Sequence, residues 1–358
     1  MTTYSPVKPP VCLLFLCVCS KELWIVSIMP RVSFAPPSLC LAFLSLLNHY
    51  LPSLPPTVRD IDVPSLHRQQ FIPSGYRPVG LSWRCCVLSL FQIHNETLNV
   101  WSHLLAAVCQ GISVDFSSLP LVLYVFSAVT YLSCSAAAHL LQSHSEQAHY
   151  SLFFLNYMGV GIYQYGCALA LCLYSSYHSS CQFLQIFLPA AAVLAWFSCA
   201  TCCFAKFYLC RLYPLHRQLF QVVPLAVTYL LVISPVVHRL IIYSQFYEVV
   251  LFLLSAFFFS CPIPEYFFPG RYDIFGHSHQ LFHILLSFCM LTQQEALFQD
   301  FLWQRQGLVR EFGEKHLLMA CVSFACLLLC CMMTALIMTI RAQAQLTKGL
   351  RYQRDICR

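Results

Sequence analysis

The feature that most constrains the fold is a series of uncharged apolar runs, most of them long enough to cross a bilayer as a helix. Leu119–Leu141 and Leu317–Ile340 are two clear cases, and a helix of about 20 residues spans the ~30 Å hydrocarbon layer. A helix also satisfies its own backbone groups, which lipid cannot do. Because 59% of the 358 residues are hydrophobic and only 9% are charged, we expect an all-α membrane protein.

Eight segments fit this description or come close to it. The first and the sixth are shorter than a full span, and Pro262 and Pro264 end the sixth. The predicted segments are Leu98–Ser113, Leu119–Leu141, Tyr150–Tyr174, Phe183–Ala205, Leu219–Tyr243, Val249–Pro262, His279–Leu297 and Leu317–Ile340.

The basic residues predict the orientation and the division of the chain. Lys and Arg favour the cytoplasmic loops of membrane proteins. If the N-terminus is cytoplasmic, only four basic residues of the membrane region fall outside: Arg239, Arg305, Arg310 and Lys315. Both ends are therefore predicted to be cytoplasmic. We divide the chain into an N-terminal extension at 1–74, a transmembrane domain at 75–341 and a basic tail at 342–358 that rests on anionic lipid headgroups.

Charge and cysteine content exclude two further classes. The net charge of +6 lies in membrane loops rather than along one exposed face, so we expect no nucleic-acid partner. Most of the 22 cysteines lie inside apolar runs, where cysteine acts as a small apolar residue. No CxxC pair is matched by a second one, which disfavours a cysteine zinc site.

Five polar side chains fall at the cytoplasmic ends of three predicted spans: Ser135, His139, Asn156, His279 and His283. His279 and His283 are four residues apart, so on a helix both rings leave the same face one turn apart. A third imidazole from another helix, that of His139, completes a zinc site with one position open for water. Ser135, one turn before His139, is placed to hydrogen-bond that water or a ligand.

A second interpretation of the same pattern stays open. The histidines can instead lie at the headgroups or satisfy one another by hydrogen bonds between helices. Polar residues within spans are costly and usually functional, which favours the metal site. Of the other polar residues, Glu96 and Asn99 are predicted to cap or anchor the first span, and Glu265 is predicted to be a solvated loop residue.

Three motifs resemble those of the progestin and adipoQ receptor (PAQR) family: HNETLNVWSH at 94–103, SxxxH at 135–139 and GHSHQLFH at 276–283. Within the family the chain looks most like the membrane progestin receptors, beta type. That likeness comes from YQYG at 163–166, ISPVVHR at 233–239 and FSCP at 259–262. The resemblance covers roughly Gly75 to Lys348.

The resemblance implies a bundle of seven transmembrane helices with an eighth at the C-terminus, and a zinc ion held by His139, His279 and His283. It also implies a cell-membrane receptor for progesterone or a related steroid, with rapid non-genomic signalling through an inhibitory G protein. Ceramidases of the wider superfamily imply an alternative, a zinc-dependent amidase acting on ceramide-like lipid, with Ser135 and Asn156 positioning water. The motifs do not identify the residues that contact the steroid.

The chain departs from the family pattern at three places. Asn156 stands where the family usually has Asp, and an amide can hydrogen-bond a water but cannot take its proton. This departure disfavours hydrolysis more than metal binding. Val232 stands where the progestin branch usually has Asp, and the first predicted span is shorter than the family's.

Overall fold

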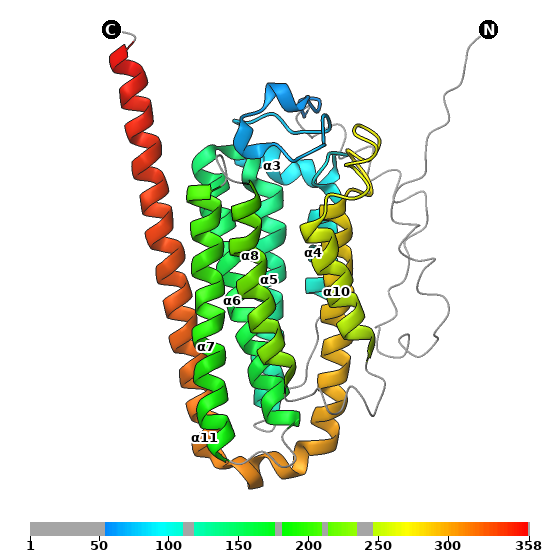
Figure 1. Ribbon diagram of the computed structural model, residues 1–358, viewed down its shortest axis with the longest axis vertical. Helices are drawn as coiled ribbons and strands as arrows, with labels where there is room; N and C mark the ends of the chain where they lie inside the picture. The colour runs from blue at the N-terminus through cyan, green and yellow to red at the C-terminus, as the bar shows by residue number, and fades with distance from the viewer. Residues whose placement is uncertain (1–53, 110–117, 176–180, 210–213, 235–245, 357–358) are drawn as a thin grey trace, which may run out of the picture. The chain divides into compact units, whose positions relative to one another are not determined.

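Helices make up nearly all of the structure, a computed structural model that describes residues 54–109, 118–175, 181–209, 214–234 and 246–356 (Figure 1). These residues contain no strand, only an isolated antiparallel bridge between Val58 and Tyr76. The α-helices are α3 (Trp83–Leu88), α4 (Thr97–Val108), α5 (Leu119–Leu141), α6 (Glu146–Ser175), α7 (Cys181–Phe204), α8 (Pro214–Ile233), α10 (Phe246–Ser260) and α11 (Ser278–Ile356).

Five helical segments of the described chain are long and apolar enough to cross a membrane, which confirms the prediction of a multi-pass all-α membrane protein. They are Leu119–His144, Gln185–Leu209, His216–Ile233, Ser278–Trp303 and Leu317–Gly349. A sixth apolar helix, Tyr247–Ser260, is shorter. The predicted ends of two spans, at 110–113 and 235–243, lie outside the described residues.

Helix α6 is not one of the five, although it is 30 residues long. It packs against α5, α7, α8 and α11, and its polar residues include Asn156 and Gln164. A helix enclosed by other helices need not present an apolar surface to lipid. The packing around α6 therefore explains how a helix with polar residues such as Asn156 forms one of the central elements of the bundle.

Three glycines let other helices approach α6 closely. A Cβ atom on Gly159 would lie 2.9 Å from the backbone of α5, and one on Gly161 would lie 2.9 Å from a carbonyl oxygen of α7. A Cβ atom on Gly166 would lie 2.8 Å from the Cβ atom of Ser127 on α5. Small residues at such contacts are a common means of helix packing in membranes.

Helix α11 is continuous in its backbone pattern but turns back on itself, so that its two arms run in opposite directions (Figure 1). Together the two arms pack against α4, α5, α6, α7 and α10. Hydrogen bonds fix the second arm: the hydroxyls of Tyr165 and Ser323 are 2.7 Å apart, and Trp196 donates to Thr334 at 3.1 Å. In the described part of the predicted tail, at 342–356, this helix simply continues.

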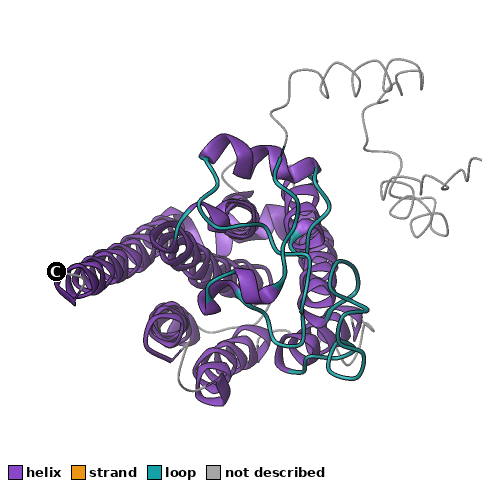
Figure 2. Cartoon of the chain, turned by 90° about the horizontal axis from the view of Figure 1, so that it is seen from above, coloured by secondary structure: helices purple, strands orange, loops and turns teal. Residues whose placement is uncertain are grey.

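Two irregular segments, residues 54–82 and 261–277, lie over the same end of the bundle (Figures 1 and 2). Ser74 in the first donates to Asp273 in the second at 2.5 Å. Val63, Ile72 and Tyr76 form a small core of their own within the first segment. Residues 54–74 of the predicted extension thus pack onto the helices, and residues 1–53 lie outside the described chain.

Candidate metal centre

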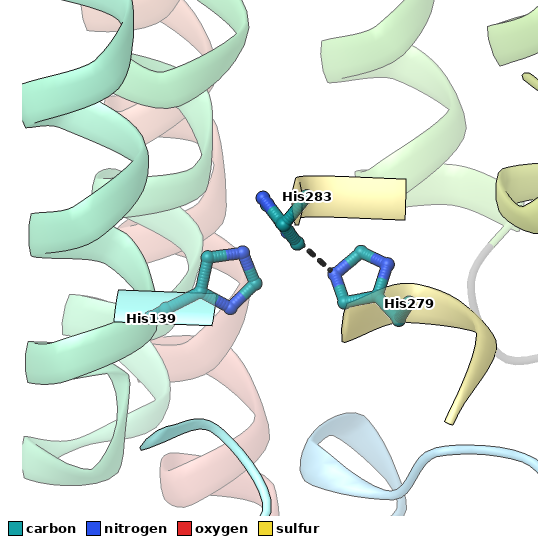
Figure 3. A group of neighbouring side chains, drawn as sticks. All are labelled: His139, His279 and His283. Atoms are coloured by element: carbon teal, nitrogen blue, oxygen red, sulfur yellow. Dashed lines mark hydrogen bonds between the residues drawn. The ribbon is translucent and has the colours of Figure 1, made fainter. Parts of the chain in front are cut away.

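His139 from α5 and His279 and His283 from the first turns of α11 point toward one another (Figure 3). We call them the three-His cluster. One ring nitrogen of each lies within 4.8 Å of those of the other two. The Nε2 atoms of His279 and His283 are 3.1 Å apart. His139 and His283 are buried, and His279 is partly buried.

Two members of the cluster have their second ring nitrogen held by another side chain. His139 Nδ1 lies 2.8 Å from the Oε2 atom of Glu96, and a carboxylate only accepts, so His139 donates from Nδ1 and keeps a lone pair on Nε2. His283 Nδ1 lies 2.7 Å from His103 Nε2. With the same donor role at its Nδ1, His283 also presents a bare Nε2 to the cluster.

The carboxylate of Glu96 accepts hydrogen bonds from three side chains. Gln69 donates to Oε1 at 2.7 Å, and Asn99 donates to Oε2 at 2.5 Å beside His139. Burial alone would raise the pKa of Glu96, but the neighbouring histidine rings and the hydrogen bond from Asn99 hold it well below its usual value. A buried negative charge therefore stands directly behind the cluster.

These residues fit a zinc ion. Tetrahedral ligation at about 2.0–2.1 Å places ligand nitrogens about 3.3 Å apart, close to the 3.1 Å between His279 and His283. Metal-bound histidines usually donate their other nitrogen to a carboxylate or similar group, as His139 does. The Ser135 hydroxyl and the Asn156 carbonyl oxygen are buried without a hydrogen-bond partner among the described residues, and a metal-bound water would supply one.

The ends of both helices that carry the cluster are anchored by buried charges. Arg77 is 4% exposed and donates to the carbonyls of His139 and Leu140, each at 2.5 Å, at the C-terminal end of α5. Glu265 is 3% exposed and accepts from the backbone and the hydroxyl of Ser278, the first residue of α11. A cation at a C-terminus and an anion at an N-terminus complement the helix dipole.

A set of loop hydrogen bonds explains why two distant motifs meet. The carbonyl of Asn95 lies 3.1 Å from the ring of His277 and accepts from the amide of Gln280 at 2.8 Å. Gly276 adopts a positive φ of 90°, which favours glycine, and its N–H donates to the Gln280 side chain at 2.7 Å. The start of α11 is thereby tied to the residue next to Glu96.

The cluster opens into a cavity of about 280 Å³, which we call the mouth cavity. Asn156 lines it together with all three histidines, whereas Ser135 does not. A second cavity of about 180 Å³, the inner cavity, is enclosed mainly by apolar residues of α6, α8, α10 and α11, including Val232. Five residues line both cavities, which are therefore adjacent: Tyr131, Val160, Leu225, Phe259 and Phe282.

One interpretation from the sequence holds in part and another is wrong. Glu96 occupies the N-cap position of α4 without a side-chain cap, but its carboxylate anchors the helix by accepting from Asn99 and from the ring of His139. Glu265 is buried, not solvated, because it holds the start of α11. The hydrogen bonds among histidines that formed the second interpretation do occur, yet they leave the oxygens of Ser135 and Asn156 without partners among the described side chains.

His103 and Arg77 support the site but were not predicted to do so from the sequence. His103 stands seven residues after Glu96, two turns along a helix, so its placement on the same face was a usable signal. Arg77 carried no such signal, because its partners lie 62 and 63 residues away along the chain.

Comparison with known proteins identifies the family. Residues 91–294 match the family described as haemolysin-III related. The chain belongs to this family, which is the PAQR family. Membrane progestin receptor beta of Homo sapiens is 44% identical over 327 residues, which cover 85% of this chain and 92% of that protein. Membrane progestin receptor alpha of Cynoscion nebulosus is 47% identical over 294 residues, 75% of this chain and 83% of that protein.

Proposed function

We propose that this PAQR protein is a cell-membrane receptor for progesterone or a related steroid, and that the steroid occupies the inner cavity. The observation that carries the proposal is a largely apolar cavity with a few polar groups in a chain whose relatives are named membrane progestin receptors. A steroid is nearly all hydrocarbon with polar ends, and such ligands fit cavities of this kind. Tyr163 and Gln293, hydrogen-bonded at 2.7 Å, are among the polar groups that line the cavity, together with Gln164 and Glu248.

Saturable, competable binding of labelled progesterone to membranes of cells expressing the chain tests this proposal, with empty-vector cells as the baseline. Ala226→Trp fills the inner cavity from α8, and Leu230→Trp places the same side chain at a position of α8 that is 64% exposed. We expect the first variant to lose binding and the second to keep it. No saturable binding by wild-type protein at the membrane, or full binding by Ala226→Trp, overturns the proposal.

The proposal includes the finer architecture. Seven helices form the bundle, the second arm of α11 is the eighth, both ends are cytoplasmic, and the three-His cluster holds zinc near the cytoplasmic side. An inhibitory G protein carries the signal. Epitope tags at either end should bind antibody only after the cell membrane is permeabilised, and a tag accessible on intact cells contradicts the orientation.

A second candidate function is a zinc-dependent amidase acting on ceramide-like lipid. What favours it is the open mouth cavity beside the cluster and the unpartnered oxygen of Asn156. A zinc ion there would supply an activated water, and the residues of the chain would orient it. Asn156→Asp adds a proton acceptor, so the rate of hydrolysis of a ceramide should rise. An unchanged rate counts against this function.

A further inference from the structure

The mouth cavity has an uneven distribution of charge. Its two acidic residues, Glu96 and Glu265, are already engaged by the donors described above. The same cavity is also lined by two cations, Lys206 and Arg217, and by His67 and His149; we call these four residues the cationic side. The charges of Lys206 and Arg217 contribute a positive potential, which attracts an anion.

His149 is the central group of the cationic side. It is 2% exposed, and neither of its ring nitrogens has a hydrogen-bond partner among the described residues. His67 packs edge-on against it with ring centroids 4.6 Å apart, and the Nδ1 atom of His67 is likewise buried without a partner. Buried polar atoms of folded proteins are nearly always hydrogen-bonded. His67 donates from Nε2 to the carbonyl of Gln142 at 3.3 Å, so its Nδ1 is an acceptor, whereas neutral His149 has one N–H to donate. The N–H of His149 therefore indicates a ligand with an acceptor oxygen.

Lys206 is close enough to share such a ligand. Its Nζ atom lies 4.0 Å from the centre of the Phe153 ring, and that ring lies 4.7 Å from the ring of His149. Burial, followed by effects that include the charge of Lys206, lowers the pKa of His67 to about 4. His67 is therefore neutral near pH 7, and the positive charge beside it is that of Lys206.

We propose that the cationic side of the mouth cavity binds the sulfate or phosphate monoester group of an amphiphile whose apolar body enters the inner cavity. The two cavities share five lining residues, so one molecule can occupy both. Progesterone is neutral and leaves the cationic side without an anion. The inference rests on the proposed ligand-binding role of the inner cavity and adds a charged head group to its ligand.

The test compares two probes that share one steroid skeleton and differ in one sulfate ester group, pregnenolone and pregnenolone sulfate, on the full chain in phosphatidylcholine nanodiscs. The sulfate ester should bind about tenfold more tightly or better, as expected for charge-assisted hydrogen bonds. Lys206→Gln and His149→Phe should each abolish this preference and leave the affinity for pregnenolone within about twofold. Lys348→Gln, an exposed lysine, is the matched control and should bind as wild type.

Competition distinguishes the source of the anion. Displacement by lysophosphatidic acid and not by inorganic phosphate supports a lipid head group, and displacement by inorganic phosphate supports a site for the free anion. Equal affinity for both probes overturns the inference, as does an equal loss of both probes in Lys206→Gln. Progesterone binding in the same preparation separates the two proposals. If progesterone binds and pregnenolone sulfate is not preferred over pregnenolone, only this inference is refuted. If progesterone does not bind and pregnenolone sulfate binds tightly, only the progestin assignment is refuted.

Discussion

Glu96 should control how tightly the three-His cluster holds zinc. Its Oε2 atom accepts from both His139 and Asn99, and its Oε1 atom accepts from Gln69. In Glu96→Gln the amide oxygen can keep the first two donors, and Gln69 can turn its own amide to face the new NH2 group. The hydrogen-bond geometry therefore survives, and what is lost is the negative charge behind His139.

The expected loss of zinc affinity depends on whether a variant removes only the charge of Glu96 or its hydrogen bond to His139 as well. Loss of an outer partner of a metal ligand weakens metal binding by about 10- to 100-fold, or about 1.4–2.8 kcal/mol. We expect Glu96→Gln to fall near the lower figure, since the Nδ1 hydrogen bond remains. Glu96→Leu removes the acceptor as well and leaves His139 Nδ1 unpaired, so it should fall near the upper figure.

The assay is zinc content per protein by mass spectrometry after dialysis of purified protein against a graded series of chelator concentrations. Glu295→Gln, an exposed glutamate on α11, is the matched control, and His139→Ala should lose zinc at every concentration. Thermal unfolding of the metal-free variants shows whether folding is intact. If both Glu96 variants fold and retain zinc as wild type does, the assigned role of the carboxylate is refuted.

Three further predictions follow from other buried groups. Arg77→Lys cannot bridge two carbonyls in the plane of a guanidinium, so it should lower the melting temperature and zinc occupancy measured in detergent, whereas exposed Arg84→Lys should change neither. Gly166→Ala places a methyl group against α5 and should cost about 1–3 kcal/mol of stability. Gly349→Ala, in α11 with open space around it, should not destabilise and should gain up to about 1 kcal/mol from helix propensity. The pKa of His67 is about 4 in the folded protein, against an ordinary value of 6.5. The contribution of His67 to the free energy of unfolding is therefore complete above pH 6.5 and is lost as the pH falls toward 4. Hydrogen exchange of residues 54–76 should show this loss, and His67→Gln should reduce it.

The sequence predicted the helices well where the signal is local. Apolar length identified five membrane spans, and the four-residue spacing placed His279 and His283 on one face, since helix geometry is the same wherever a helix forms. The meeting of His139 with that pair followed from a predicted common depth in the membrane. Each of these predictions needed only the period of the helix and the thickness of the bilayer.

The support of the site could not be predicted in the same way. Glu96 reaches His139 over 43 residues, and Gln69 reaches Glu96 over 27, through loops whose paths depend on tertiary packing. Glu265 carries a charge that usually marks exposure, and only its hydrogen bonds to Ser278 explain its burial. The span predicted at Tyr150–Tyr174 lies within α6, so this helix was predicted from the sequence although it is not one of the five apolar candidates.

The packing of residues 54–82 onto the helices has a practical consequence for the design of truncated versions of the protein. The region that matches the family, 91–294, contains all three histidines of the cluster, so an expression clone limited to it would look complete by motif. Such a clone would lack the side chain that binds the far oxygen of Glu96, the guanidinium that closes the end of α5, and the whole second arm of α11. A clone that starts before Val58 and runs to the end of α11 keeps all three.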